Sequence, residues 1–333
     1  MKKIILLISI LLLGGCYDYT EIDDISIITG IILDYNNNEY ELTTEVFENE
    51  KESKVKIYKT TCKSIDLCIL EISKESNKEL FISHLKTLIL TDRTINKDIK
   101  FYDYFLRNSK SKMNFYVYYV SDEYKDKIFN DSDNSSLYLK DMTDFNIKDY
   151  STSIKLLFTD MIQKLLEKGF DNIYPSISIK DDKLCIDSLV YSNKELNNNE
   201  SIIYNILSNN TISTYITIPC DNNSFSLNIN HLKTKYKFDN TLNIEIKSNS
   251  KLSNYNCKYN LNDKNTIKTL EELANKYITN NSYDLINKSK KDNYDFLGLI
   301  RYIYKHSKKE IDLKDLTVKI NTNIKINSIG ESR

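Results

Sequence analysis

Glycine, proline and tryptophan are scarce or absent in this chain of 333 residues, which has six glycines, two prolines and no tryptophan. Gly14 and Gly15 lie in an apolar segment at the amino end, so four scattered glycines remain for the rest of the chain. Loops that cradle phosphates need glycines close together, because the backbone must approach the phosphate oxygens. The sequence therefore excludes a P-loop and a dinucleotide-binding fold.

A surplus of charge of one sign is also missing. The chain has 46 basic and 47 acidic side chains, and its formal net charge is −1. Proteins that bind nucleic acids carry an excess of lysine and arginine to neutralise phosphates, so we expect no nucleic-acid partner. With 41% hydrophobic and 28% charged residues, the chain can bury a core, and its length fits two or three domains.

Familiar catalytic and metal-binding patterns do not occur. The three histidines, His84, His231 and His306, lie far apart, and none belongs to a His-Glu-x-x-His or His-x-His motif. The sequence has no Gly-x-Ser-x-Gly nucleophile motif, and no pair of carboxylates is marked out as a general acid and base. We therefore predict no catalytic residue, no metal site and no cofactor, and we predict that the protein is not an enzyme.

The amino end has the features of a bacterial lipoprotein signal. Two lysines precede an apolar run from Ile4 to Leu13, which is too short to cross a bilayer about 30 Å thick as a helix. Leu13-Gly14-Gly15-Cys16 follows, and small residues before a cysteine are typical of a lipobox. We predict a signal peptide over 1–15, lipidation of the Cys16 thiol with acyl chains such as palmitate, and a tether over 16–24. Two or more acyl chains anchor a protein stably.

Five cysteines follow Cys16, so at least one of them has no partner within the chain. Cys62 and Cys68 lie six residues apart without a matching second pair, which is a poor spacing for zinc. Cys68 falls on the apolar face of a predicted helix. We interpret these cysteines as small buried hydrophobic residues.

Periodicity predicts the secondary structure of the first half. Alternation of apolar and polar residues predicts strands at 25–33, 40–46, 55–57 and 113–119, and residues 85–90 are predicted as a short buried strand. Helical spacing of apolar residues predicts helices at 65–72 and 98–108. Residues 121–150 are polar, and we interpret them as a linker or an irregular connection.

The second half mixes the two kinds of element again. We predict helices at 154–165, 202–207, 266–278 and 296–305, with Ser151 or Ser153 and Gly169 as the caps of the first. Strands are predicted at 175–179, 184–190, 212–219, 225–238, 241–248 and 316–326. Strands and helices do not alternate regularly, which favours an α+β fold with mixed, largely antiparallel sheets and packed helices in two or three domains. We divide the chain into an amino-terminal region, 25–175, and a carboxyl-terminal region, 176–333.

One prediction concerns how the carboxyl-terminal region is packed. Phe296, Leu299, Ile300 and Ile303 have helical spacing, so one face of their helix should pack on a sheet. The last strand would supply the face of that sheet. Gly298 lies within this helical pattern, at a cost of roughly 1 kcal/mol relative to alanine.

Several segments, taken in order, resemble the Ger(x)C family, the lipoprotein C subunits of nutrient germinant receptors in endospore-forming bacteria. Cys16-Tyr17-Asp18-Tyr19-Thr20-Glu21-Ile22-Asp23-Asp24, with Gly30 and Asp34 after it, is similar to the start of the family. The segment 79–90 resembles its His-x-Lys strand with His84 and Lys86, and 101–108 resembles its next helix with Arg107. The segments 184–195, Asp295-Phe296-Leu297-Gly298 and 318–330 resemble later elements of the family.

This resemblance implies a non-enzymatic, lipid-anchored subunit of a germinant receptor, with a mixed α+β structure. It implies two integral-membrane receptor subunits as partners, and a location on the outer face of the spore inner (cytoplasmic) membrane. There the subunit would help to trigger spore germination. His84, Lys86, Arg107, Asp295 and Gly298 become candidates for structural or partner-docking roles. The alternative is a lipid-anchored extracytoplasmic solute-binding protein of a transporter, which would normally show two lobes with regularly alternating strands and helices.

Overall fold

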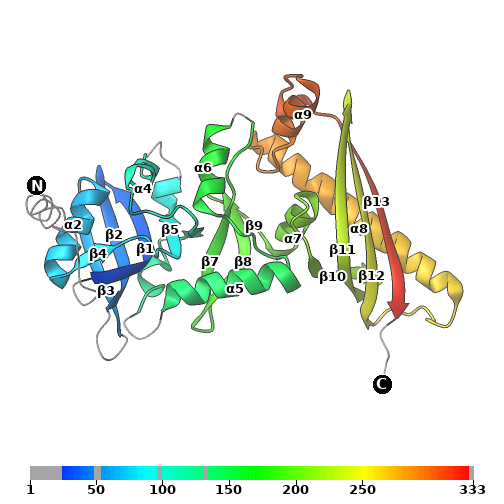
Figure 1. Ribbon diagram of the computed structural model, residues 1–333. Coiled ribbons are helices and arrows are strands. Elements are labelled where there is room, and N and C mark those ends of the chain that lie inside the picture. The colour runs from blue at the N-terminus through cyan, green and yellow to red at the C-terminus, as the bar shows by residue number, and fades with distance from the viewer. Residues whose placement is uncertain (1–24, 49–53, 96–99, 131–133, 168, 330–333) are drawn as a thin grey trace, which may run out of the picture.

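The computed structural model describes residues 25–329, except for residues 49–53, 96–99, 131–133 and 168. The predicted signal peptide, Cys16 and the tether therefore lie outside the described residues. Within the described part, two β-sheets follow one another along an elongated molecule, and helices pack against them (Figure 1).

The first sheet has nine strands in the order β3-β2-β1-β5-β6-β7-β8-β9, with the short β4 beside β1. Its strands are β1 (Ile25–Asn36), β2 (Glu39–Glu48), β3 (Lys54–Cys62), β4 (Glu79–Phe81), β5 (Thr87–Thr91), β6 (Tyr116–Val120), β7 (Tyr174–Lys180), β8 (Lys183–Tyr191) and β9 (Lys194–Leu196). Antiparallel hairpins form its two ends, whereas β1, β5, β6 and β7 pair in parallel at the centre.

Both faces of this parallel centre are covered. Every residue of β5 and β6 is buried. The helices around the sheet are α2 (Ile65–Ser76), α3 (Asp92–Ile95), α4 (Tyr102–Arg107), α5 (Ser135–Asp149) and α6 (Phe158–Leu166), with a 3-10 turn, η2 (Lys125–Lys127). Residues Leu88 and Val117 belong to the core that contains α2, α4 and α6, whereas Ile89 and Tyr118 belong to the core beneath α5. Such strands read as short apolar runs because neither face meets water.

Helix α5 lies in the segment predicted as a polar connection, and that prediction was wrong. Its sequence has a weak apolar pattern, but its amino end is held by a strand distant in sequence. The fully buried Glu45 of β2 accepts hydrogen bonds from the backbone N–H groups of Ser135 (2.7 Å) and Ser136 (3.2 Å). At Gly30 of β1, a Cβ atom would lie 1.9 Å from Ser136 Oγ, so only glycine allows this close approach.

The second sheet has four strands in the order β10-β11-β12-β13, in which β13 runs parallel to β12. The carboxyl-terminal elements are β10 (Ser213–Cys220), β11 (Asn223–Asp239), β12 (Thr241–Tyr255), β13 (Val318–Ile329), α7 (Asn198–Leu207), α8 (Lys264–Asp292), α9 (Leu299–Ser307) and the 3-10 turn η3 (Leu313–Asp315). Burial alternates along β10 to β13, so one face of this sheet is buried and the other is polar and exposed.

The long helix α8 lies along the free edge of β13. Side chains spaced four residues apart on α8 meet alternate residues of β13. Ile326 N donates to Glu271 Oε1 (2.9 Å), Ile324 N to Asn275 Oδ1 (2.7 Å) and Ile320 N to Tyr283 Oη (3.0 Å), and the hydroxyls of Thr322 and Thr279 lie 2.8 Å apart. Four helical residues advance about 6 Å and two strand residues about 6.6 Å, so the two spacings match. The helix therefore satisfies an edge that would otherwise be open to pairing.

The helix that covers the last strand is thus α8, and not the helix predicted at 296–305. That helix, α9, begins only at Leu299, and Gly298 precedes it in a left-handed conformation with φ of 68°. The predicted cost of a glycine within a helix therefore does not arise. The buried Leu299 and Ile303 do face the core, but on the side of α9 that meets β11.

Two further boundaries differ from the predictions. Helix α6 begins at Phe158 and is not capped by Ser151 or Ser153, because residues 156 and 157 pair with β6 instead. The boundary expected between residues 175 and 176 falls inside β7, so the first sheet continues to β9 and the sheets divide between β9 and β10. The α+β class is confirmed, with more parallel pairing than expected.

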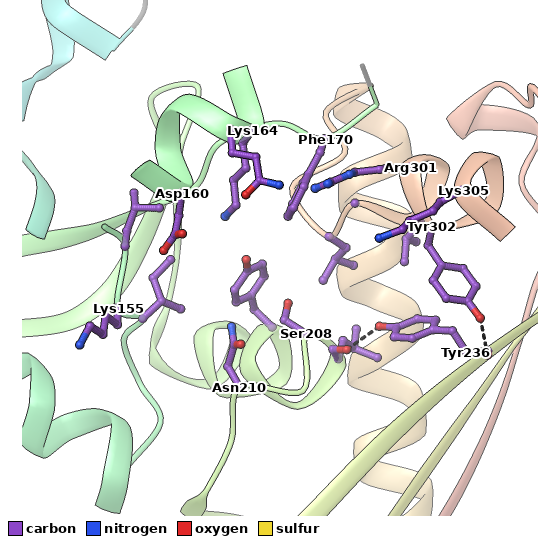
Figure 2. A pocket seen from close by; sticks show the side chains of 18 of the residues that line it. Lys155, Asp160, Lys164, Phe170, Ser208, Asn210, Tyr236, Arg301, Tyr302 and Lys305 are labelled. Atoms are coloured by element: carbon purple, nitrogen blue, oxygen red, sulfur yellow. Dashed lines mark hydrogen bonds between the residues drawn. The ribbon is translucent and has the colours of Figure 1, made fainter. Parts of the chain in front are cut away.

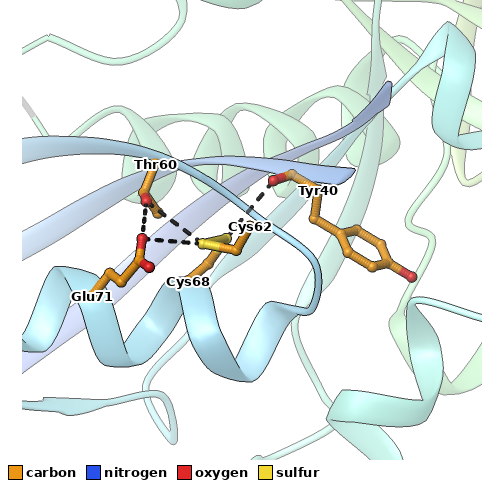
Figure 3. Close-up of a disulfide and its surroundings, with 5 residues drawn as sticks. All are labelled: Tyr40, Thr60, Cys62, Cys68 and Glu71. Atoms are coloured by element: carbon orange, nitrogen blue, oxygen red, sulfur yellow. Dashed lines mark hydrogen bonds between the residues drawn. A yellow bond between two sulfur atoms is a disulfide. The ribbon is translucent and has the colours of Figure 1, made fainter. Parts of the chain in front are cut away.

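Four of the cysteines form disulfides, which the sequence interpretation did not include, although Cys62, Cys68 and Cys220 are buried as expected. Cys62 at the end of β3 is bonded to Cys68 in the first turn of α2, with Cα atoms 5.4 Å apart (Figure 3). Thr60 donates to Glu71 beside this bond. Cys220 is bonded to Cys257 across 5.9 Å between Cα atoms, and Cys185 is free.

Candidate functional site

Two loops, one from the part of the chain around each sheet, lie side by side and are held together by hydrogen bonds. The loop between α6 and β7 exchanges hydrogen bonds with the turn between α8 and α9. Asp171 N donates to Asp295 O (3.0 Å), and Asp295 N donates to Asp171 Oδ2 (2.6 Å). Tyr294 Oη donates to Asn172 O (2.8 Å). These contacts fix the position of α9 relative to α6, although more than a hundred residues separate the two loops.

Asp295 holds the amino end of α9. Its buried carboxylate accepts hydrogen bonds from Leu299 N (3.0 Å) and Ile300 N (2.8 Å). Burial raises the pKa of Asp295 to about 6, and the nearby Asp171 adds to the increase, whereas the backbone donors oppose it. Burial also raises the pKa of Asp171.

Gly298 completes this turn. Its φ of 68° is rarely adopted by other residues, and a Cβ atom there would lie 3.0 Å from the ring of Phe170. Phe170 can therefore lie directly against the turn that begins α9. The Asp-x-x-Gly segment seen in the sequence thus builds one wall of a cleft.

The cleft has a volume of about 490 Å³ and lies between α6, α7, α9 and β11. Figure 2 shows Asp160 and Lys164 of α6 on one side, Arg301, Tyr302 and Lys305 of α9 on the other, and Phe170 at the rim between them. Its charged lining is predominantly basic. Lys155, Lys164, Arg301, Lys305 and His306 are the basic residues, and Asp160 is the acidic one.

Lys164 and Arg301 lie on the two sides of Phe170. The Lys164 ammonium is 4.6 Å from the centre of the Phe170 ring, and the Arg301 guanidinium carbon is 5.7 Å from it. Burial lowers the pKa of Lys164 to about 8; Asp160 opposes this shift, and Arg301 adds to it. Arg301 is ion-paired with Glu167. The arrangement is suited to holding an anion, and the residues that line this cleft include no hydrogen-bonded nucleophile and base.

The structure places His84 and Lys86 together, at the start of β5. Both line a small cavity of about 170 Å³ with Lys112, Asn114 and Lys140. His84 is exposed, and its ring centre is 6.0 Å from that of Phe81. The backbone of Lys86 joins neighbouring strands, because its N–H donates to Thr29 O and its carbonyl accepts from Tyr116 N, each at 2.8 Å.

Arg107 lies apart from both of these groups. It ends α4, its side chain is 80% exposed, and its Nε is 2.7 Å from Asp103 Oδ2. It lines a third cavity of about 410 Å³ with Tyr40 and Lys100. The sequence candidates are therefore distributed over three places and do not form one centre.

Sequence reasoning missed the buried ion cluster around Asp34. The Asp34 carboxylate accepts from Thr91 Oγ1 (2.6 Å) and Arg93 Nε (2.9 Å) and lies 2.8 Å from Lys125 Nζ. Burial alone would raise the pKa of Asp34, but Arg93 and Lys125 outweigh it and hold this pKa well below its usual range. An aspartate within an otherwise apolar strand was the available signal. For Lys164 and Phe170 the sequence carried none.

Among the described residues, no group of three or more histidine, cysteine, aspartate or glutamate side chains could hold a metal ion. No described helix is both long enough and apolar enough to cross a bilayer.

Comparison with known proteins assigns both halves of the chain. Residues 18–179 match the model described as "Spore germination protein N-terminal domain", and residues 192–330 match "Spore germination B3/ GerAC like, C-terminal". A solved structure titled "Crystal Structure of the GerBC protein" is similar in fold, with a TM-score of 0.59 and 13% identity over 93% of this chain and 100% of that one. Comparison with curated proteins gave no match. The chain belongs to the Ger(x)C family of spore germination proteins, the C subunits of germinant receptors.

Proposed function

We propose that the protein is a non-enzymatic, lipid-anchored C subunit of a nutrient germinant receptor, and that it acts with two integral-membrane subunits to trigger germination. The observation that carries this proposal is the match of both halves of the chain to models of spore germination proteins. The subunit would sit on the outer face of the spore inner membrane, held by acyl chains on Cys16.

The disulfides support a location outside the cytoplasm. Cys62–Cys68 and Cys220–Cys257 are both formed. Such bonds persist in oxidising compartments and are rare in the cytosol, where thiols are kept reduced. This agrees with a chain that is exported by a lipoprotein signal.

His84, Lys86 and Arg107 are our candidates for docking to the membrane subunits. They lie away from the basic cleft, and among the described residues the ion-pair partner of Arg107 is Asp103 on its own helix. An exposed ion pair of this kind contributes little to stability, so a role in folding would be small.

The cleft favours one alternative, a solute-binding lipoprotein. A basic cavity of about 490 Å³ between two sheet-containing parts could accept a small anion. The hairpins that flank the first sheet and the antiparallel second sheet differ, however, from two lobes of alternating strands and helices. Saturable binding of a transported solute by the purified chain, with germination unaffected by deletion of its gene, would favour this alternative.

The anchor can be tested by labelling cells with a fatty acid. Cys16→Ala should lose the label and remain unprocessed, because alanine cannot form the thioether. Cys185→Ala removes the free thiol of the described chain and is the matched control, which should keep the label. Retention of label in Cys16→Ala would exclude the anchor.

The receptor role can be tested in spores. Deletion of the gene should abolish the response to the nutrient while vegetative growth stays normal. His84→Ala with Lys86→Ala, and separately Arg107→Ala, should reduce co-purification with the membrane subunits at normal melting temperature. A hydrolytic activity that disappears in these variants while the complex stays intact would contradict the non-enzymatic role.

A further inference from the structure

The exposed face of the second sheet is rich in lysine. The exposed lysines on this face come from β11, β12 and β13, and they are Lys233, Lys235, Lys237, Lys247, Lys251, Lys319 and Lys325. We call this surface the lysine face. The chain as a whole has a net charge of −1, so positive charge is gathered here rather than being in general excess.

Few of these charges are neutralised by the protein. The acidic residues on the face are Glu245, which pairs with Lys247, and Asp239 at the end of β11. Lys325 lies 3.0 Å from Glu271 of α8. The other five lysines form no ion pair within the described residues. Most of the charge is therefore available to a partner.

The register of the strands places like charges beside one another. Lys233 of β11 lies directly opposite Lys247 of β12, and Asn243, opposite Lys237, has Lys319 on its other side. Adjacent strands are about 4.8 Å apart, and like charges directly opposite each other destabilise a sheet. Lys235 lies opposite Glu245, so one pair of opposite charges occurs beside the pair of like charges, and lysine predominates on the face.

We propose that the lysine face binds the anionic headgroups of the membrane. Protein–protein interfaces are enriched in arginine and aromatic residues and depleted of lysine. The four strands contain no arginine, and their exposed charges are mainly lysines, so the composition of this face does not favour a protein partner. Lysines near an anionic bilayer are attracted as point charges without a specific pocket. The exposed face of a four-stranded sheet is broad enough to lie against such a surface.

This inference rests on the proposed attachment of the chain to a membrane. Residues 16–24 could reach at most about 30 Å from the start of β1. The first strands and the second sheet lie at opposite ends of the molecule (Figure 1). The lysine face would therefore provide a second contact with the bilayer, far from the anchor.

The test uses a chain that begins at Tyr17, which retains every described element and has no acyl chain. It is sedimented with vesicles of phosphatidylcholine alone and with vesicles that also contain phosphatidylglycerol. We expect binding to the anionic vesicles only, and loss of binding at high salt. K233Q/K235Q/K237Q should weaken binding at least tenfold, since each lysine contributes roughly fivefold.

The control is K63Q/K148Q/K183Q, which removes the same charge from exposed lysines outside the second sheet. Its binding should change much less. Equal losses in the two variants, or wild-type binding by the first at an unchanged melting temperature, would overturn the proposal. So would binding to poly-glutamate but not to vesicles, which would assign the face to an acidic polypeptide. Because this chain lacks Cys16, the result is independent of the labelling test of the anchor.

Discussion

The first and second sheets differ in how many of their faces are covered by helices. The first has a parallel centre, and helices cover both of its faces, so β5 and β6 are buried throughout. The second has one buried face and one solvated face, and α8 satisfies its edge. The first sheet buries carboxylates with partners, as Asp34 and Glu45 show, whereas the charged side chains of the second sheet lie on its solvated face and, of its polar side chains, only hydroxyl side chains such as Thr214 and Thr234 are buried. A two-sided core tolerates few substitutions, whereas a one-sided sheet has a free surface.

The largest effect should come from charges introduced into the strands. Leu88→Lys and Ile89→Lys, on opposite faces of β5, should each destabilise the fold by more than about 4 kcal/mol, because neither face offers water or a partner. In β12, Ile246→Lys should do the same, whereas the reciprocal Lys247→Ile should change stability by less than about 0.5 kcal/mol. Chemical denaturation measures all four. A stable Ile89→Lys variant would show that the first sheet is open on one side.

The disulfide that closes the longer loop should contribute more to the stability of the fold. Cys220→Ser with Cys257→Ser opens a loop with a sequence separation of 37, and Cys62→Ser with Cys68→Ser opens one of 6. Chain entropy predicts losses of about 4 and about 2 kcal/mol. Denaturation under oxidising conditions tests this, with Cys185→Ser as the unpaired control. Equal losses of stability would mean that the length of the closed loop does not determine how much each disulfide stabilises the fold.

One buried aspartate in each region should produce opposite pH dependences. The pKa of Asp34 is lowered on folding, so it stabilises the fold above about pH 4, and this stabilisation is lost as the pH falls further. The pKa of Asp295 is raised to about 6, so its contribution becomes unfavourable as the pH rises from about 4 to about 6, by up to roughly 3 kcal/mol.

Asparagine variants separate the two aspartates. Leu299 N and Ile300 N donate to different oxygens of Asp295, so Asp295→Asn keeps an acceptor for only one of them. It should lose the pH dependence between about 4 and 6, because no group titrates at this position. Asp34→Asn should lose stability at pH 7, because Arg93 and Lys125 lose their buried partner. Stability measured against pH decides this; an unchanged slope in Asp295→Asn would contradict it.

A smaller effect is expected at the edge of the second sheet. Asn275→Ala should cost about 1–2 kcal/mol, because Ile324 N–H loses its acceptor while α8 still covers it. Lys268→Ala, at an exposed position of the same helix, is the control and should be nearly neutral. Faster hydrogen exchange at Ile324 in Asn275→Ala alone would support the role of the ladder. Exchange at the wild-type rate would exclude it.

The sequence determined the elements whose faces meet different surroundings. Alternation located β2 and β13, and helical spacing located α2 and part of α8, because one side of each meets the core and the other is less buried. Alternation also located β1, although residues 28–34 of that strand are buried on both faces. The ordered motifs also led to the correct family.

Tertiary structure alone decided the features whose partners lie far along the chain. Helix α5 depends on Glu45, the start of α9 is fixed against a loop that ends the first half, and the cleft combines Lys164 with Arg301. Local periodicity predicts which face of a helix or strand is buried, but not which distant residues will contact that face. Those contacts form only when the chain folds, and so the caps, the disulfides and the cleft could not be predicted from spacing.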